Sequence, residues 1–152
     1  MKSLLLSALI IAAAPALARD TYPPVDVLLQ TETSFIGEPL EYPQGTPQIS
    51  MAIVTMQPGQ ETGEHRHDAP LAAYVLEGEI TVDYGEAGRK TYKSGDAFVE
   101  AYRSPHTGIN TGAGIAQILA VFAGSDSVSN TVAGDQAHGA SSTFCEYPLH
   151  AV

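Results

Sequence analysis

Short apolar runs separated by glycine-bearing turns dominate the middle of this chain. Between residues 49 and 122 the runs are rich in Val, Ile, Tyr and Phe, and turn signals such as Gly85-Glu86-Ala87-Gly88 separate one run from the next. Runs of this length and composition are typical of the strands of a sandwich or barrel. We therefore predict β-strands at Ile49–Met56, Ala72–Leu76, Glu79–Tyr84, Arg89–Tyr92, Ala97–Ala101, His106–Asn110 and Ile115–Phe122.

After residue 18 no segment repeats its apolar positions at the helical period over a convincing length. The sequence therefore predicts an all-β protein with one barrel domain, which we place at residues 48–124. Of 152 residues, 134 follow residue 18, a length that suits a single domain with one hydrophobic core.

The first eighteen residues have the pattern of a secretory signal peptide. Lys2 supplies the charged start, Leu4–Ala14 is almost wholly apolar, and Ala16-Leu17-Ala18 offers a cleavage site. The apolar run is shorter than the about 20 residues of a transmembrane helix, although an uncleaved anchor is the alternative. We expect a mature protein from Arg19 that is periplasmic or secreted. No cysteine follows directly, so no lipid anchor is expected.

Two segments flank the barrel. Residues 19–47 carry five prolines, at positions 23, 24, 39, 43 and 47, and prolines exclude long helices. We expect an extended arm with one or two edge strands, which either lies across a second copy in a homodimer or closes its own barrel. Residues 125–152 are rich in Ser, Gly and Ala, and we expect a tail that is loosely ordered or draped on the barrel.

The chain is strongly acidic. It has 7 basic and 17 acidic residues, a net charge of −10, and removal of Lys2 with the signal peptide leaves 6 against 17, or −11. Such a surface repels nucleic acid and anionic lipid, so neither is expected as a partner. The single cysteine, Cys145, cannot form an internal disulfide.

Three histidines form the main candidate site. His65 and His67 are one residue apart at the start of an apolar run, and a strand directs such positions to one face. His106 follows the turn-forming segment Tyr102-Arg103-Ser104-Pro105 and supplies a third imidazole. Neutral imidazoles suit zinc, copper, iron and nickel, and three of them leave coordination positions open. The alternative is that the first two histidines are merely exposed polar residues in a charged loop.

The spacing around the first two histidines resembles the first sequence motif of the cupins. That motif reads Gly, five residues, His-x-His, three or four residues, Glu, six residues, Gly. Here Gly59, His65, His67 and Gly78 fall in place, whereas the glutamate position is occupied by Leu71. The carboxylate ligand usual in the family is therefore absent from this strand.

A second cupin motif follows about sixteen residues later. It reads Gly, five residues, Pro-x-Gly, two residues, His, three residues, Asn. Gly95, His106 and Asn110 match it, while Ala101 and Arg103 replace its proline and glycine. Through these motifs the chain, over roughly residues 49–124, is identified as a member of the cupin superfamily.

The resemblance implies a cupin-type jelly-roll β-barrel, or double-stranded β-helix. It also implies one divalent metal ion, which could be Zn, Fe, Mn, Ni or Cu, bound by His65, His67 and His106. The function expected from this is that of a metal-dependent enzyme that acts on a small organic molecule. Its reaction would be of dioxygenase, isomerase or lyase type, and an oxidoreductase of the dioxygenase-like kind is one of these. The alternative is a non-catalytic cupin module that binds, senses or carries a small ligand or metal.

Glu100 is the candidate catalytic residue. On the strand predicted at 97–101 it shares a face with Phe98, which points into the barrel by the resemblance. A glutamate among apolar side chains needs a partner, so we expect either a fourth metal ligand or a base that acts through a metal-bound water. The alternative is a position at the barrel rim in water. Asn110 is expected to hydrogen-bond within the barrel, and Arg103 is either a surface residue or a contact for a carboxylate substrate.

Overall fold

Strands and turns make up the fold in the computed structural model, which describes residues 23–134. The elements are β1 Pro47–Met56, β2 His65–Arg66, β3 Leu71–Glu77, β4 Glu79–Asp83, η1 Gly85–Ala87, β5 Arg89–Lys93, β6 Ala97–Val99, β7 Thr107–Ile109, β8 Ala116–Ser125 and β9 Val132–Ala133. Within the described range no helix is long and apolar enough to cross a membrane. The predicted all-β class is confirmed.

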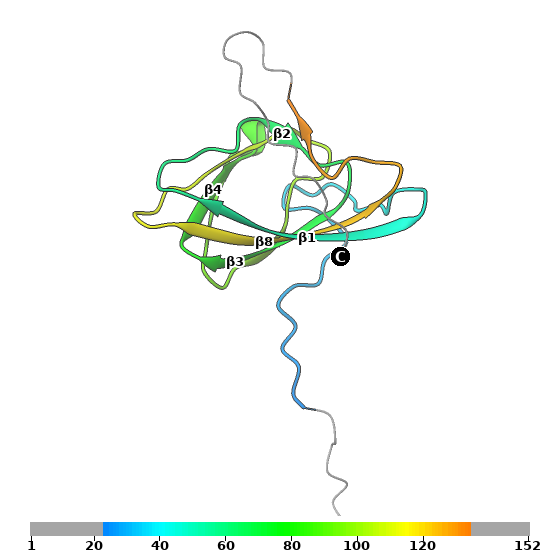
Figure 1. Cartoon of the computed structure of the whole chain (residues 1–152), viewed down its shortest axis with the longest axis horizontal. Coiled ribbons are helices and arrows are strands. Elements are labelled where there is room, and N and C mark those ends of the chain that lie inside the picture. Colours follow the sequence, from blue (N-terminus) through cyan, green and yellow to red (C-terminus); the bar gives the residue numbers. More distant parts are fainter. Residues whose placement is uncertain (1–22, 135–152) are drawn as a thin grey trace, which may run out of the picture.

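Two main sheets face each other across the core (Figure 1). One has four strands in the order β1-β8-β3-β6, and the other has three in the order β5-β4-β7. Neighbouring strands are antiparallel throughout these sheets. A third, two-stranded sheet of β2 and β9 lies at one end of the molecule, where the candidate histidines are found.

Alternation along the strands decides which residues form the core. In the larger sheet Ala73 lies opposite Ala120 on one side and Phe98 on the other, and all three are buried. Val82 of β4 faces them from the second sheet and is 1% exposed. Tyr92 stacks on Phe98 with ring centroids 3.6 Å apart, so aromatic packing joins the two sheets at this point.

The motif glycines serve turns, as expected. Gly59, Gly78 and Gly95 have φ values of 75°, 73° and 96°, in the left-handed region that favours glycine. Gly78 has a second constraint, because a Cβ atom there would collide with the carbonyl oxygen of Ile115. The backbone approach between the β3–β4 turn and the start of β8 therefore requires a residue without a side chain.

The predicted strands are found with shifted ends. β1 begins at Pro47, two residues before the expected start, and β8 runs on to Ser125. β6 ends at Val99, although the N–H of Glu100 still donates to the carbonyl of Leu71, and β7 is confined to Thr107–Ile109. A strand that was not expected, β9, pairs with β2 and brings residues 132 and 133 beside the first histidine.

The prediction of edge strands in the arm is wrong for its described part. Residues 23–46 contain only an isolated bridge between Thr33 and Pro39, so the arm neither adds a regular strand nor closes the barrel. Prolines and turns interrupt the ladder, and the segment instead forms a tight loop at residues 33–39. Phe35 packs from this loop on the rings of Tyr84 and Tyr92.

Some expectations lie outside the described residues. These are the signal peptide at residues 1–18, the start of the arm at Arg19, most of the tail, and the residues His138, Cys145 and His150.

Candidate metal centre

Backbone pairing brings the three histidines to one end of the barrel. The N–H of His65 donates to the carbonyl of His106 at 3.0 Å, and the N–H of His106 donates to the carbonyl of His65 at 2.9 Å. The short strand β2 pairs on its other side with β9, with His65 opposite Ala133. Because His67 follows two residues later, its side chain returns to the same region.

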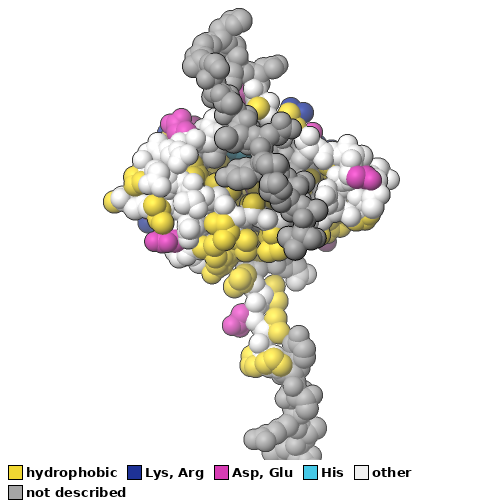
Figure 2. Space-filling model, viewed as in Figure 1, with side chains coloured by type: hydrophobic (Ala, Val, Ile, Leu, Met, Phe, Trp, Pro, Cys, Tyr) yellow, Lys and Arg dark blue, Asp and Glu magenta, His cyan; other side chains and the backbone are white. Residues whose placement is uncertain are grey.

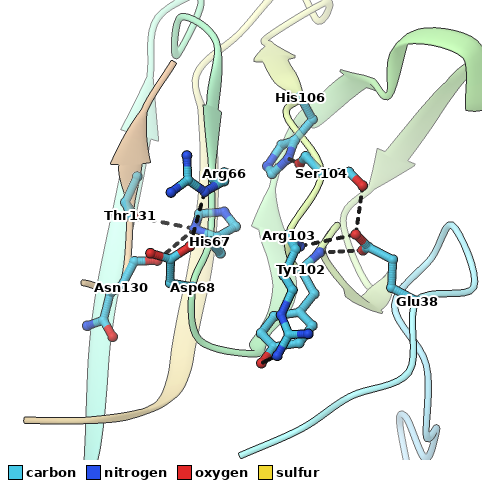
Figure 3. A network of polar contacts seen from close by, with 10 residues as sticks. All are labelled: Glu38, Arg66, His67, Asp68, Tyr102, Arg103, Ser104, His106, Asn130 and Thr131. Atoms are coloured by element: carbon cyan, nitrogen blue, oxygen red, sulfur yellow. Dashed lines mark hydrogen bonds and ion pairs between the residues drawn. The ribbon is translucent and has the colours of Figure 1, made fainter. Parts of the chain in front are cut away.

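Each imidazole has one ring nitrogen against a backbone carbonyl oxygen. Nδ1 of His65 lies 3.0 Å from the oxygen of Gly63, Nδ1 of His106 lies 3.0 Å from that of Ser104, and Nδ1 of His67 lies 3.0 Å from that of Asn130. Figure 3 shows the last two contacts. A carbonyl can only accept, so each Nδ1 carries the proton and each Nε2 is left with a lone pair.

The free nitrogens converge. One ligand atom from each of His65, His67 and His106 lies within 4.8 Å of the other two. Nε2 of His106 is buried and has no hydrogen-bond partner among the described residues. A buried polar atom without a partner is costly, and a metal ion shared by the three lone pairs would satisfy it. The donor set therefore fits a metal that accepts imidazole ligands.

Burial keeps the imidazoles neutral. Desolvation, with repulsion from His65 and His106, lowers the pKa of His67 from 6.5 to about 3. Desolvation also lowers the pKa of His65 and of His106 below the ordinary value. All three rings are thus unprotonated near neutral pH, which is the form that binds metal.

Glu100 lies inside the barrel, as expected, and it stands across from the empty glutamate position. Its N–H donates to the carbonyl of Leu71 at 3.0 Å, which continues the register that pairs Ala72 with Val99. Residues opposed in this way project from the same face of a sheet. Glu100 is only 7% exposed and lines the same cavity as Leu71 and the histidines. The rim alternative is excluded.

The carboxylate of Glu100 is held by its surroundings. It accepts a hydrogen bond from the backbone N–H of Ala101, at 2.9 Å. Desolvation raises the pKa of Glu100 above its usual value, although this hydrogen bond and the nearby hydroxyl of Tyr84 oppose the increase. Among the described residues the group of atoms within 4.8 Å comprises the three histidines and not Glu100. The carboxylate thus lies beside the cluster and belongs to the outer layer of the site.

Two tyrosines extend this polar network. The hydroxyls of Tyr84 and Tyr92 lie 3.0 Å apart, and burial raises the pKa of both phenols. Both side chains are buried. Tyr84 also lies near Glu100. The spacing of the sequence could not reveal this proximity, because Tyr84 follows β4 and Glu100 follows β6, and these strands belong to different sheets.

The arm supports the turn that carries His106. Glu38 accepts hydrogen bonds from the N–H of Tyr102 at 2.6 Å, the N–H of Arg103 at 3.1 Å and the hydroxyl of Ser104 at 2.7 Å (Figure 3). Burial raises the pKa of Glu38, but these hydrogen bonds outweigh it and leave the pKa below its ordinary value. Because the carbonyl of Ser104 accepts a hydrogen bond from His106, Glu38 stabilises the turn that orients the His106 ring.

A cavity of about 470 Å³ opens from the histidines into the barrel. Its wall is largely apolar and includes Leu71, Val82, Phe98, Ile118 and Phe122, while Gln60, Thr62, Glu100 and the three histidines supply its polar end. Within the described part of the chain, no lysine or arginine lines it. Its volume is in the range of small-molecule sites.

The other residues singled out from the sequence have structural roles. Asn110 is buried and donates to the carbonyls of Met56 and Gly114, so its expected packing role is confirmed. Arg103 is exposed, stacks on Tyr102 and pairs with Glu41 at 2.9 Å, so it is a surface residue that contacts the arm.

Sequence reasoning missed three contributors to the site: Glu38, Asn130 and Thr131. The last two lie in the segment before β9 and contact Nδ1 of His67 at 3.0 and 3.3 Å. The sequence has a weak strand signal here, because the β-branched residues Thr131 and Val132 lie between the turn-forming Asn130 and Gly134. The run is too short to be distinguished from an irregular tail.

Residues 52–122 match the family model described as Cupin domain. Among curated proteins, none matches the sequence. Many solved structures resemble the chain. One is an oxalate oxidase, with 26% identity over 49% of this chain and 41% of that protein and a TM-score of 0.45.

Two further solved structures are similar to comparable extents. The oxalate decarboxylase of Lactobacillus farciminis, crystallised as a formate complex, has 26% identity over 56% of this chain and 26% of that protein, with a TM-score of 0.49. The protein TT1209 from Thermus thermophilus has 30% identity over 53% of this chain and 75% of that protein, with a TM-score of 0.45. The chain thus spans less than half the length of the two oxalate enzymes.

Proposed function

The chain carries a cupin domain with the all-β jelly-roll fold expected from its sequence, and on this premise we propose that it is a metal-dependent enzyme. One divalent ion is bound by His65, His67 and His106, and the substrate is a small, largely apolar organic molecule in the adjoining cavity. The reaction is of the dioxygenase, isomerase or lyase type.

The observation that carries this proposal is the orientation of the three imidazoles. Each Nδ1 faces a carbonyl oxygen, and one ligand nitrogen from each ring lies within 4.8 Å of the other two at the polar end of a cavity. Three neutral ligands leave open positions on a metal, the arrangement of catalytic rather than structural sites. The ion would supply Lewis acidity or activation of oxygen.

The cavity favours an uncharged substrate. Its wall is formed by side chains such as Val82, Phe98 and Ile118, and its described lining contains no lysine or arginine. An anionic substrate would meet the carboxylate of Glu100 with only the metal to compensate its charge, and a buried unpaired charge is costly. An apolar molecule with one polar group toward the histidines avoids this cost.

Glu100 is the proposed acid or base. Its raised pKa, caused by burial, brings the carboxyl closer to the pH range in which it can exchange a proton. The N–H of Ala101 holds the carboxylate in orientation, and the nearby hydroxyl of Tyr84 is itself in contact with Tyr92. In this position Glu100 can receive a proton from a substrate bound between it and the histidine cluster, or return one to it.

The protein is proposed to act outside the cytoplasm as a homodimer. Support for export is the pattern of residues 1–18, with Lys2, an apolar run and a small-residue cleavage site. A chain exported before folding acquires its metal outside, where the affinity order favours copper and zinc over iron and manganese. Metal found in a purified sample therefore depends on where the protein folded.

A second function, a module that binds or carries a ligand or metal without chemistry, is supported by one feature. Glu61 and Glu100 are the two carboxylates among the described residues that line the cavity, and the lining contains no cysteine or serine. Such a module would hold its ligand in the same apolar cavity, but it would not turn it over.

Turnover separates the two functions. Protein loaded in turn with zinc, copper, iron, nickel and manganese is screened for oxygen uptake and product formation with phenols, diketones and thiols. The enzyme is supported by turnover that is lost in His106→Ala and reduced in Glu100→Gln. Binding of one of these compounds with no turnover under any metal would support the module instead.

A further inference from the structure

The inner face of the four-stranded sheet carries one row of small side chains. In the antiparallel register Ala73 of β3 stands opposite Ala120 of β8, which in turn stands opposite Ala52 of β1. Opposed residues project from the same face of a sheet, so the three methyl groups form one row across three strands. Ala73 and Ala120 are 5% and 4% exposed and line the cavity that adjoins the histidines.

Larger side chains stand on both sides of this row. Leu71 is opposite Phe122 on one side, and Val75 is opposite Ile118 on the other. These two ridges are separated by four residues, or about 14 Å, along each strand. The alanines between them therefore form the floor of a depression, which we call the alanine trough. Its width between the ridge side chains suits a single ring.

The alanine trough is closed at one end and open at the other. Phe98 stands opposite Ala73, is 6% exposed and ends the row inside the barrel. From Ala73 to Ala52 the row crosses two strand spacings, or about 10 Å. Ala52 lies on the edge strand β1 and is exposed, and its neighbour Val54 lines the cavity with 40% exposure. Figure 2 shows hydrophobic side chains at the surface on the side of the body where β1 lies in Figure 1.

The second sheet covers the trough with small and β-branched residues. Val82 of β4 and Gly108 of β7 are opposite each other in the register, and both line the cavity. A Cβ atom at Gly108 would lie 3.0 Å from Cδ1 of Ile80, so a side chain there would press on its neighbour. Packed sheets lie about 10 Å apart when larger side chains fill the space between them. Alanines that face glycine and valine therefore leave a low gap, which suits a molecule that is thin in one dimension.

The histidines lie beyond one ridge of the trough. The ring centroids of His67 and Phe122 are 5.5 Å apart, and the N–H of Glu100 donates to the carbonyl of Leu71 on the same ridge. A molecule seated on the alanines thus has one edge toward the imidazoles and the carboxylate. A single polar group on that edge can reach them while the rest of the molecule stays on methyl groups.

We propose that the alanine trough is the substrate subsite and that it selects a flat, unsaturated ring with one polar group toward the histidines. This inference rests on the proposed function and names its substrate class. The face of the ring lies on the methyl groups of Ala73 and Ala120, and its edge meets the ring of Phe98, an arrangement that aromatic pairs favour. A saturated ring is thicker, so it overfills the gap below Val82 and Gly108.

Two alcohols test the shape of the subsite. Benzyl alcohol and cyclohexylmethanol carry the same polar group on a flat and on a puckered ring, and calorimetric titration of the zinc-loaded full chain measures their affinities. Hydrophobic transfer alone favours the saturated alcohol, which has the larger apolar surface. We expect the reverse order, with benzyl alcohol bound roughly 5-fold more tightly or better, the smallest effect typical of overpacking. Equal affinities, or tighter binding of cyclohexylmethanol, would overturn the proposal.

Filling the trough is the second test. Ala120→Leu adds three carbons at the centre of the floor and should weaken the binding of benzyl alcohol about tenfold or more. Ala73→Leu should do the same, and it serves where the first variant fails to fold. Both should keep the wild-type metal content, because neither position touches the histidine cluster. Unaltered binding of benzyl alcohol in these variants, with the β fold retained by circular dichroism, would overturn the proposal.

Ala72→Leu is the matched control. It makes the same change one residue away on β3, but Ala72 lies on the outer face of the sheet and is exposed. The affinity for both alcohols should stay at the wild-type value. A loss as large as that in Ala73→Leu would show that the strand, and not the trough, is responsible, and would overturn the proposal.

Metal content separates this inference from the proposed function. A wild-type protein that binds no metal overturns the proposed function, and the two alcohols are then titrated into the metal-free chain. A preference for the flat ring there, lost in Ala120→Leu, supports the trough by itself. A protein that binds metal through the histidines and shows no such preference overturns the trough and leaves the proposed function in place.

Discussion

At the scale of single residues, the site depends on which ring nitrogen of each histidine is free. The backbone carbonyl oxygens of Gly63, Ser104 and Asn130 each accept a hydrogen bond from Nδ1 of one imidazole. The lone pair of each ring is therefore on its other nitrogen, which is free to bind a metal. Carbonyl contacts of this kind fix the orientation and tautomer of metal ligands. His65 and His67 could be placed together from their spacing, whereas the carbonyl of Asn130 could not, because it lies 63 residues from His67. The carbonyls of Gly63 and Ser104 are local, but their contacts depend on the conformation of the turns.

Glu100→Gln is the first residue-scale prediction. The amide keeps the size of the side chain but cannot carry a negative charge or accept a proton as a carboxylate does. Metal affinity or turnover should fall roughly 10- to 100-fold, the range for residues that support a metal site from outside its ligands. Glu64→Gln is the control, since Glu64 is exposed next to His65 and should change little. Unaltered affinity and turnover in Glu100→Gln would remove this residue from the site.

The pairing of Glu100 with Leu71 offers a rescue. These two residues face each other across neighbouring strands and line the same cavity. Leu71→Glu in a Glu100→Leu background moves the carboxylate to the position that the cupin motif reserves for it. Metal affinity should return at least in part. Failure of the exchange in a protein that still folds would show that the carboxylate must approach from the strand of Glu100.

The second residue-scale prediction concerns pH. His67 has a pKa of 6.5 when unfolded and about 3 in the metal-free fold, mainly through desolvation. Between these values the unfolded chain binds more protons, so acidification through this window lowers the free energy of unfolding. At pH 5 the loss from His67 is about 2 kcal/mol relative to pH 7. The lowered pKa values of His65 and His106 act in the same direction.

Urea unfolding in the presence of a chelator, at pH 7 and pH 5, measures this loss. Glu100 offsets part of it, because its raised pKa makes the fold bind a proton as the pH falls toward 4.5. The comparison with His67→Gln separates the two effects, since that variant lacks the titrating imidazole and should lose less stability on acidification. Equal losses in both proteins would contradict the assignment.

At the scale of elements, the arm and β9 are the two parts that hold the ends of the site. Glu38 of the arm receives three hydrogen bonds from the turn before His106, and β9 pairs with the strand of His65. Neither the hydrogen bonds of Glu38 nor the pairing of β9 could be predicted from the sequence. The arm was recognised as extended from its prolines, but contacts across about sixty residues leave no periodic signal, and β9 has only two residues.

Glu38→Gln is the element-scale prediction. The substitution removes the charge that strengthens hydrogen bonds from residues 102–104, so the free energy of unfolding should fall by about 1.5 to 3 kcal/mol, the range for a hydrogen bond to a charged group. Metal affinity should fall as well, since the turn that supports His106 is loosened. Urea unfolding and metal titration measure the two effects.

Glu41→Gln is the control for that experiment. Glu41 lies in the same arm and pairs with Arg103, but both side chains are exposed, and exposed ion pairs contribute little. If Glu38→Gln behaves like this control, the arm does not support the ligand.

At the scale of the whole molecule, most of the barrel could be predicted because strands and turns have local signals in the sequence. The apolar runs at residues 72–76, 79–84 and 115–122 became β3, β4 and β8 with ends shifted by at most three residues. The pairing order β1-β8-β3-β6 could not be read from the runs, since it depends on long-range packing. The same order brings Glu100 opposite Leu71, which explains how a site without the usual glutamate can keep a carboxylate.

The central claim is that one metal ion is bound by three histidines, and metal content tests it most directly. Protein freed of metal is titrated with zinc and with copper, and bound metal is measured by elemental analysis after removal of the excess. Wild-type protein should retain one ion per chain. His65→Ala, His67→Ala and His106→Ala should each retain almost none while circular dichroism still reports the β fold, and His138→Ala should behave as wild type. Wild-type protein that retains no metal, or full retention in His106→Ala, would contradict the account.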